Sequence, residues 1–376
     1  MKINLATAIT LSTAPFFGVI AHANTDLSPD FEIQGRVMVD YVAFDGIHNE
    51  GHEASEWLLR RARVAIKHKS SKDWKAELEI DIDSANEEAD ITDGYIAYEG
   101  WSWGDVAFGQ MKENFGLEET TSSLNISTME RSLVTEVFAP GRNFGIQMTN
   151  DSNAHSWSLG MFQASEDEYG LDGYAYTGRL TFSPINEPAA LLHLGVSASL
   201  RDMLGNNYEI NEPLGISVGD SVVESPDIAA DNVRQVSLEG AMVKGSFSLQ
   251  GEWMQQQVKG QANSDDSKTS TNFSGYYVLA SYFLTGESRV YDDGSFDETS
   301  PNGERGAWEI VTSYSTVDLE NHALGAVAKI YLIGLNYYAT GRAKLMLNLS
   351  RADNESSNPE ETGEGNALSF RAQYEF

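Results

Sequence analysis

Five positively charged side chains fall within ten residues, in the stretch RRARVAIKHK at positions 60–69. The whole chain of 376 residues has only 25 Lys and Arg against 56 Asp and Glu, which gives a net charge of −31. Guanidinium and ammonium groups gathered in this way either pair with carboxylates or bind anions. The stretch therefore supplies the first candidates for a site.

The spacing of these cations predicts a β-strand with two unlike faces. Successive side chains of a strand point to opposite sides, so Arg61, Arg63 and Lys67 share one face. The apolar side chains on the other face are Leu58, Ala62, Val64 and Ile66. Arg60 falls in the apolar phase, and we expect it either to extend to a membrane interface or to be turned inward by a β-bulge.

The next strand carries carboxylates on its inward face, opposite these cations. In KAELEIDID, residues 75–83, acidic and apolar side chains alternate strictly, and the acidic ones are Glu77, Glu79, Asp81 and Asp83. Cross-strand pairing would let cations and carboxylates neutralise each other and brace a wall. Alternatively, the cations lie on one wall and the carboxylates on another, and small solutes pass through the transverse electric field between them. Both interpretations stay open at this point.

Alternation of apolar and polar residues recurs along the whole chain and indicates the fold that must position these groups. We expect 16 strands, an even number that suits an all-β, transmembrane antiparallel β-barrel. Their approximate ranges are 31–45, 57–69, 75–83, 91–99, 104–111, 142–149, 155–164, 173–183, 189–201, 233–243, 246–258, 273–285, 306–318, 327–339, 342–352 and 366–376.

Both ends of the chain agree with export to a bacterial outer membrane. Residues 1–23 have one Lys, a short apolar stretch and Ala-His-Ala at positions 21–23, as in a cleaved signal peptide, which leaves 24–376 as one barrel domain. The chain has no cysteine, so its stability comes from packing and backbone pairing. The last strand ends on Phe376, in phase with Leu368, Phe370, Ala372 and Tyr374, as expected for a barrel-closing strand.

The connections between the strands alternate in length. Short turns alternate with long polar segments, and we expect the long segments 202–232, 259–272 and 286–305 at the external end of the barrel. Tyrosines near strand ends suit the headgroup level of a membrane, where a ring is half apolar and half wet. The pairs are Tyr174 and Tyr176, Tyr276 and Tyr277, and Tyr337 and Tyr338.

One long segment, 112–141, lies between two predicted strands and shows no clean alternation. A connection of this length in a compact fold usually serves a function. We expect it to fold into the lumen and to narrow it. Lys112, Arg131 and Arg142 would then join Arg36, Arg61 and Arg63 at the constriction.

Several stretches resemble the phosphate-selective porins O and P, in order from about Arg36 to Asn232. They are LLRRARVAIKHKSSKDWKAELEIDID, DGYIAYEG, GQMKENFGLEETTSS, MERSL, FAPGRNFGIQM and IAADN. The resemblance implies a homotrimeric outer-membrane barrel that takes up anions such as phosphate or polyphosphate by passive diffusion. It also implies a central anion site made of Arg36, two of Arg60, Arg61 and Arg63, together with Asp93 and Arg131.

Two departures from that family bear on selectivity. The stretch TTSSLNIST before MER lacks a lysine that the selective members have there. The region NEPLGISVGDSVVESPDIAADNVRQ holds only Arg234 and several acids where those members carry a ladder of arginines. We therefore expect a porin with a cationic constriction and weak anion preference. The alternative is a general or weakly cation-preferring diffusion porin without phosphate specificity.

Other function classes fit less well. The acidic balance argues against nucleic acid as a partner, since phosphates would repel the surface. An outer-membrane hydrolase would need a Ser–His pair at the lipid-facing surface, but His193, Ser197 and Ser199 are predicted to face the lumen. An adhesin would not explain cations inside a barrel. We expect no cofactor and no metal site, while membrane lipid and lipopolysaccharide surround the barrel.

Overall fold

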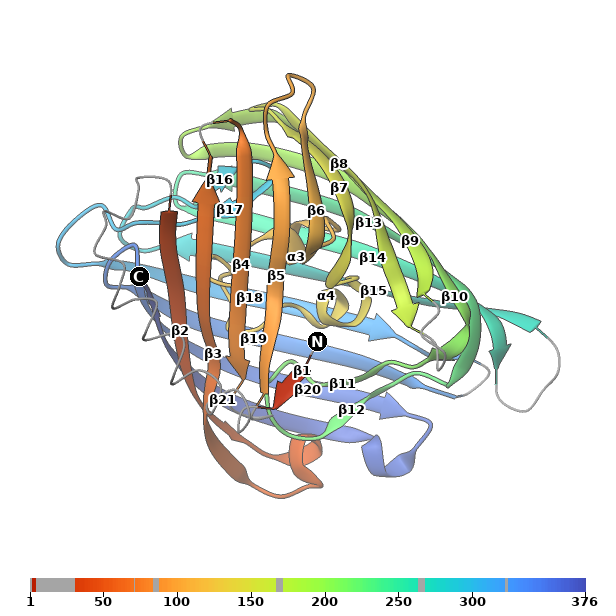
Figure 1. Ribbon diagram of the computed structural model, residues 1–376. Coiled ribbons are helices and arrows are strands. Elements are labelled where there is room, and N and C mark those ends of the chain that lie inside the picture. The colour runs from red at the N-terminus through yellow and green to blue at the C-terminus, as the bar shows by residue number, and fades with distance from the viewer. Residues whose placement is uncertain are drawn as a thin grey trace.

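The computed structural model describes residues 2–4, 31–70, 72–83, 88–166, 172–262, 268–321 and 324–376, and its strands form one closed antiparallel ring (Figure 1). Sixteen strands make the ring, as predicted, because β21 pairs back onto β2. They are β2 (Phe31–Phe44), β3 (Ala54–Lys69), β4 (Trp74–Asp83), β5 (Glu88–Tyr98), β6 (Asp105–Lys112), β7 (Arg142–Asp151), β8 (His155–Glu166), β9 (Asp172–Glu187), β10 (Ala190–Tyr208), β13 (Ile228–Lys244), β14 (Phe247–Ala262), β15 (Lys268–Phe283), β18 (Ala307–Asp318), β19 (Ala326–Tyr338), β20 (Ala343–Ser356) and β21 (Gly363–Glu375).

The remaining elements are short and lie in the connections. They are β1 (Lys2–Asn4), η1 (Gly46–Asn49), α3 (Leu117–Thr120), α4 (Leu133–Phe138), β11 (Asn211–Pro213), β12 (Ser221–Glu224), β16 (Val290–Asp292), β17 (Ser295–Asp297) and η2 (Pro359–Glu361). The strand β1 borders the start of β5. The rest of the predicted signal peptide and its cleavage site lie outside the described residues. Among the described residues, no helix is long and apolar enough to cross a membrane.

The strands are two-sided, as the alternation predicts. On β4, Leu78, Ile80 and Ile82 are exposed on the outer surface, whereas Glu79 is buried on the inner surface. Similar outward rows of Leu, Ile, Val, Phe and Tyr follow the other strands around the ring. An apolar outer surface and polar inner surface are the distribution that a lipid bilayer requires of a barrel.

The two ends of the barrel domain meet at Gly35 and Phe376. The backbone N–H of each residue donates to the carbonyl oxygen of the other at 2.9 Å. The Phe376 ring lies over Gly35 so closely that a Cβ on Gly35 would come within 2.3 Å of the ring. Glycine is therefore required at this point of the seam, and the terminal Phe closes the ring.

A β-bulge at Arg60 changes the phase of β3. Met38 of β2 faces Arg61, but the next residue, Val39, faces Leu59, so Arg60 is the extra residue. The bulge turns Arg60 inward, which was one of the two predicted outcomes. It also corrects the expectation for Leu58, which is buried inside with Val42 and Phe44 rather than facing lipid.

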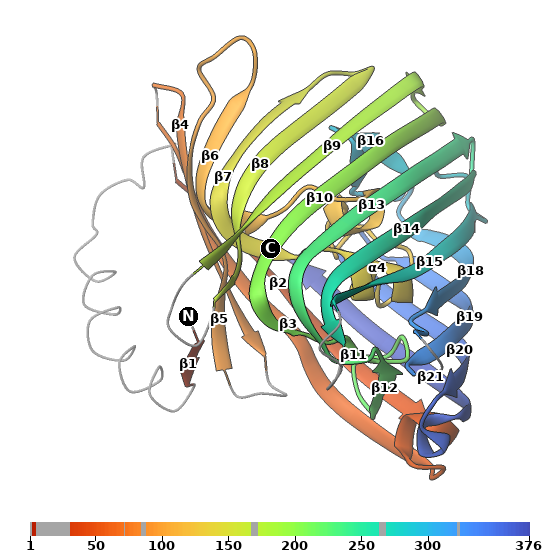
Figure 2. The same ribbon diagram turned by 90° about the vertical axis from the view of Figure 1, so that its right-hand side faces the viewer.

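Three connecting segments, 113–141, 209–227 and 284–306, contact inward-facing side chains of the wall. The first carries α3 and α4, which lie inside the curve of the strands in Figure 2. Its contacts reach opposite walls, since Ser197 of β10 accepts from the Gly116 N–H and Lys344 of β20 donates to the Ile126 carbonyl. The second segment crosses to β20, where Asn354 donates to the Val222 carbonyl.

The segment 284–306 lies at the end of the barrel that carries the short turns, not at the external end as expected for 286–305. It follows β15, and strand alternation places every second connection at this end. Tyr291 of the segment contacts His193 at the start of β10 and Ser183 near the end of β9. The expectation was wrong because length was taken as the sign of an external loop.

A dry apolar core fills much of the lumen beside β13–β20. Side chains of α4 pack there against the wall and against segment 209–227. Buried members include Leu133, Val134, Phe138, Leu214, Val222, Val258, Phe273, Val311 and Ile330. Apolar packing of this kind excludes water from this part of the lumen.

The tyrosine pairs behave differently from one another. Tyr174, Tyr176 and Tyr276 are exposed on the outer surface. Tyr277 and Tyr338 instead point inward, where Tyr277 donates to Glu252 and Tyr338 donates to Glu309. Their placement at the membrane interface was a wrong expectation, because adjacent residues of a strand face opposite sides.

Candidate functional site

A polar cavity of about 330 Å³ lies inside the barrel between the wall strands β2–β7 and segment 113–141. The wall contributes charged side chains because β2–β5 present alternate residues to the lumen, and Lys112 and Arg142 join them from the paired ends of β6 and β7. The segment contributes small polar groups and one arginine. The lining residues are Arg36, Arg61, Arg63, Lys67, Glu77, Glu79, Asp93, Lys112, Asn114, Thr120, Ser122, Ser123, Arg131 and Arg142.

Eight of the nine site residues singled out from the sequence line this cavity. They are Arg36, Arg61, Arg63, Lys67, Asp93, Lys112, Arg131 and Arg142. Arg60 is the exception. Seven of the eight are cations, and the carboxylates that line the cavity or lie directly behind it are Glu77, Glu79, Asp81, Asp93 and Glu119. The cations that line the cavity therefore outnumber the carboxylates that line it, in an otherwise acidic chain.

The wall cations are paired with the carboxylates of β4 and β5. Arg63 lies 2.7 Å from Asp81, and Arg142 lies 3.0 Å from Asp93. Lys67 lies 3.6 Å from Glu77. The sequence left open whether these charges neutralise each other or form a polar passage, and the cavity combines a partial pairing with an excess of cations.

Arg61 is the cation with the weakest pairing. Its Nη1 contacts Met38 Sδ at 3.9 Å, and its Nη2 lies 4.0 Å from Glu130. A guanidinium has five N–H donors, and these two contacts are long for hydrogen bonds. Arg61 therefore retains donors for an anion in the cavity.

Within segment 113–141, Glu119 holds two cations at the cavity. Lys112 Nζ lies 3.4 Å from Glu119 Oε1, and Arg131 Nε lies 3.0 Å from Oε2. Burial would raise the pKa of Glu119, but Lys112 and Arg131 outweigh burial and lower this pKa. Arg131 also donates to the carbonyls of Glu118 and Thr121, which fixes the curve of the segment.

Arg60 is separated from the cavity and anchors the segment instead. Arg60 Nε and Nη2 donate to both carboxylate oxygens of Glu130, at 3.0 and 2.9 Å. Glu130 is also bound by Arg371 of β21, whose other partner is Asp40 of β2. The buried pairing joins the segment to the seam of the barrel, so Arg60 acts on the segment's position.

A second polar cavity of about 270 Å³ continues from the first toward the short-turn end. It shares Glu77, Asp93 and Lys112 with the first cavity. Its further lining includes Lys75, Tyr95, Glu99, Asp105, Gln147 and Thr149. The two cavities therefore adjoin each other along β4–β7.

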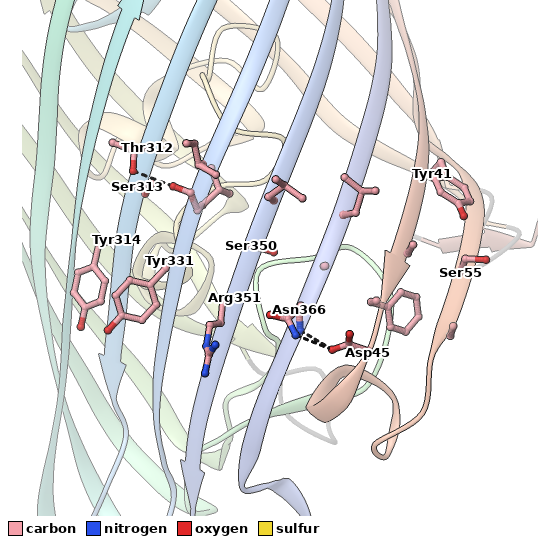
Figure 3. A pocket seen from close by; sticks show the side chains of 18 of the residues that line it. Tyr41, Asp45, Ser55, Thr312, Ser313, Tyr314, Tyr331, Ser350, Arg351 and Asn366 are labelled. Carbon is pink, nitrogen blue, oxygen red and sulfur yellow. Dashed lines mark hydrogen bonds between the residues drawn. The ribbon is translucent and has the colours of Figure 1, made fainter.

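A concavity of about 1240 Å³ lies on the outer surface of the barrel and not in the lumen. Figure 3 shows its lining from β18–β21 and from β2 and β3. Tyr314 and Tyr331 stand side by side there, and Asn366 donates to Asp45. This concave outer surface combines apolar and hydroxyl groups, which suits a protein contact within the membrane.

Sequence reasoning missed the groups that hold the cations in place. Glu119, Glu130, Ser122 and Ser123 lie in the segment without alternation, and no local pattern shows which side of it faces the wall. Arg371 belongs to the last strand, where its phase placed it on the inner surface, but its partner is 241 residues away. Among the described residues, no group of three His, Cys, Asp or Glu side chains is arranged to hold a metal.

A closed ring of 16 two-sided strands with segments folded into a polar lumen defines an outer-membrane porin. Solved porins share the fold. An anion-selective porin from Comamonas acidovorans matches with a TM-score of 0.62 at 13% identity, over 92% of this chain and 99% of that chain. OprB of Pseudomonas putida matches with a TM-score of 0.61 at 9% identity, over 92% and 94%.

The chain belongs to the phosphate-selective porin O and P family, whose model matches residues 31–376. Porin O of Pseudomonas aeruginosa is 28% identical over 96% of this chain and 91% of that protein. A protein of Caulobacter vibrioides is 22% identical over 89% of this chain and 71% of that protein. The protein is thus a porin of the bacterial outer membrane, and its fold and family are those of a channel.

Proposed function

We propose that the protein is a diffusion channel that prefers small inorganic anions, and that they pass through the cationic cavity beside β2–β7. The observation that carries the proposal is the convergence of seven cations on one cavity of a chain with a net charge of −31. A narrow site of low dielectric constant strengthens the field of its own charges. Solvent-exposed acids more than about 8–10 Å away are screened by salt and do not cancel it.

The preference extends to anions in general and is not confined to phosphate. Segment 209–227, at the external end, contains no Lys or Arg, and Arg234 lies in the outward-facing phase of β13. Segment 209–227 therefore supplies no cation that would collect phosphate at the external end. Chloride, phosphate and polyphosphate then pass at rates set by their size and charge. Both the family relationship and the cationic cavity support this passage of anions.

The reversal potential of the purified protein in a planar bilayer, under a gradient of KCl, tests this function. An anion-preferring channel gives a chloride-to-potassium permeability ratio above one. A ratio below one would favour the general or cation-preferring alternative and would end the proposal.

Three copies of the chain form the working unit, with the concave outer surface as the contact between them. The surface is a wide hollow of the outer wall, and the solved porins of similar fold include a trimeric form of OmpT from Vibrio cholerae. Thr312→Trp on this surface should dissociate the trimer in detergent, as measured by light scattering. Ala198→Trp, outward-facing on β10, is the matched control, and equal masses for both variants would remove this surface from the contact.

A further inference from the structure

Glu79 lies at the centre of three arginines in the candidate cavity. Arg36 of β2 approaches Glu79 Oε2 at 3.1 Å, and Arg63 of β3 approaches Oε1 at 3.3 Å. Arg142 of β7 lies 4.0 Å from Oε1. Thr92 Oγ1 of β5 also donates to Oε1, at 2.8 Å. Four strands therefore supply donors to one carboxylate, which stands on a fifth strand, β4.

The arrangement differs from the other ion pairs of the cavity. Asp81 accepts only from β3 and Asp93 pairs only with Arg142, so each braces one arginine against its neighbouring strand. Glu79 is shared among three guanidinium groups, and each of these has a further partner of its own. Arg36, for example, also donates to Ser122 and Ser123 of segment 113–141.

Three guanidinium groups and a hydroxyl around two oxygen atoms are the donors that bind a free carboxylate or phosphate. The carboxylate of Glu79 fills this set of donors and is 5% exposed. A solute anion that enters the cavity must therefore compete with Glu79 for Arg36, Arg63 and Arg142. Arg61, whose contacts are long, remains open to it.

We propose that Glu79 is the specificity-determining residue of the channel, a tethered anion that occupies the oxyanion site of the lumen and keeps phosphate from being held there. This inference rests on the proposed anion preference. It means that wild-type protein passes phosphate and chloride with little saturation. The free energy that a phosphate ion gains by binding the three arginines is no larger than the free energy needed to displace the Glu79 carboxylate from them.

The test is Glu79→Gln, with inorganic phosphate and then pyrophosphate added to single channels in chloride. The amide keeps an oxygen for Thr92 and one arginine but gives up the negative charge. We expect the concentration that halves the chloride current to fall by about tenfold to a hundredfold relative to wild type. The chloride-to-potassium permeability ratio should rise as well.

Glu77→Gln is the matched control, because Glu77 lies two residues away on the same inward face. Its carboxylate pairs with Lys67 and Lys75 and accepts from Tyr95, without an arginine. The Glu77→Gln substitution removes one negative charge, as Glu79→Gln does. If the loss of charge alone mattered, phosphate block would change equally in both variants. Equal block in the two variants, or unchanged block in Glu79→Gln, overturns the role of Glu79.

Glu79→Asp gives a second measurement if the Gln variant does not fold. The Asp side chain keeps the carboxylate but is one methylene shorter, so its hydrogen bonds to the arginines are weaker. Phosphate block should therefore strengthen, by a smaller factor than in Glu79→Gln. Wild-type protein that is already half-blocked by submillimolar phosphate would contradict the inference. A wild-type preference for potassium would contradict the proposed function instead, so the two failures are distinguishable.

Discussion

Glu130 of the lumen segment and Arg371 of the last strand form a buried ion pair at 2.5 Å across 241 residues of sequence. Arg60 binds the same carboxylate from β3, and Asp40 holds the other side of Arg371. Segment 113–141 is thus attached where the barrel closes. One carboxylate joins it to strands at both ends of the barrel domain.

Glu130→Gln should release the segment while leaving the barrel intact. The change leaves two buried arginines with less than their full pairing, at a cost of about 3 kcal/mol. We expect faster backbone hydrogen exchange in residues 113–141 and larger, noisier single-channel currents. Glu136→Gln, an exposed carboxylate on α4, is the control. Unchanged exchange in Glu130→Gln would show that the apolar contacts of α4 alone hold the segment.

The external segment 209–227 should loosen in acid because of His48. Its ring is 1% exposed, and neither nitrogen has a hydrogen-bond partner among the described residues. Burial lowers the pKa of His48 to about 4, against the opposing effects of Asp45 and Asp220. The Asp220 N–H donates to the His48 carbonyl, so protonation of the ring acts on a contact between η1 and the segment.

The pKa of His48 is below its usual value near 6.5, so the contact between η1 and segment 209–227 is more stable when the His48 ring is neutral. The contact is therefore fully stable above about pH 6.5 and weakens as the pH falls toward 4. Hydrogen exchange in residues 209–227 should accelerate over this range in wild type and not in His48→Gln. His155→Gln, at an exposed turn, should keep the wild-type profile. An identical profile in His48→Gln would exclude His48 as the cause.

Neutralising Arg61 and Arg63 together should weaken the anion preference. Both side chains line the cavity, and the double change to Gln removes two of its seven cations. The chloride-to-potassium permeability ratio should fall by about twofold to fivefold, as measured by reversal potentials. Arg234→Gln removes a charge from the outward-facing phase of β13 and should leave the ratio unchanged. A double variant with the wild-type ratio would place the selective site elsewhere.

The sequence was sufficient for the barrel and for most of the cavity lining. Period-two alternation determines which side chains face inward, so the cations of β2 and β3 could be assigned to the lumen without a structure. Arg142 is in phase with the outward-facing Phe144 and Ile146, and only its place at the end of the long segment indicated the cavity. Alternation did not predict the β-bulge at Arg60, which shifts the phase of β3 and turns Leu58 toward the lumen. Bulges leave no reliable local signal, although a charged residue in the lipid phase, as at Arg60, is a warning of one.

The positions of the segments that fold into the lumen could not be predicted from alternation. Segment 209–227 packs on β19 and β20 through contacts between residues far apart in the sequence, and 284–306 enters from the short-turn end. Neither shows a periodicity, because irregular chain that lines a lumen is shaped by the wall around it. Glu79 was visible as one of several lumen carboxylates, but its three arginines come from three separate strands and only the fold brings them together.

The central claim is that ions cross the barrel through the cavity beside β2–β7, and a cysteine placed there tests it most directly. The chain has no native cysteine, so Ser122→Cys can be modified alone with a negatively charged thiosulfonate during current recording. We expect the current and the chloride preference to fall on modification. Ser315→Cys, 3% exposed in the packed lumen beside α4, should show no change. A current that is unaffected by complete modification of Ser122→Cys, verified by mass, would contradict the account.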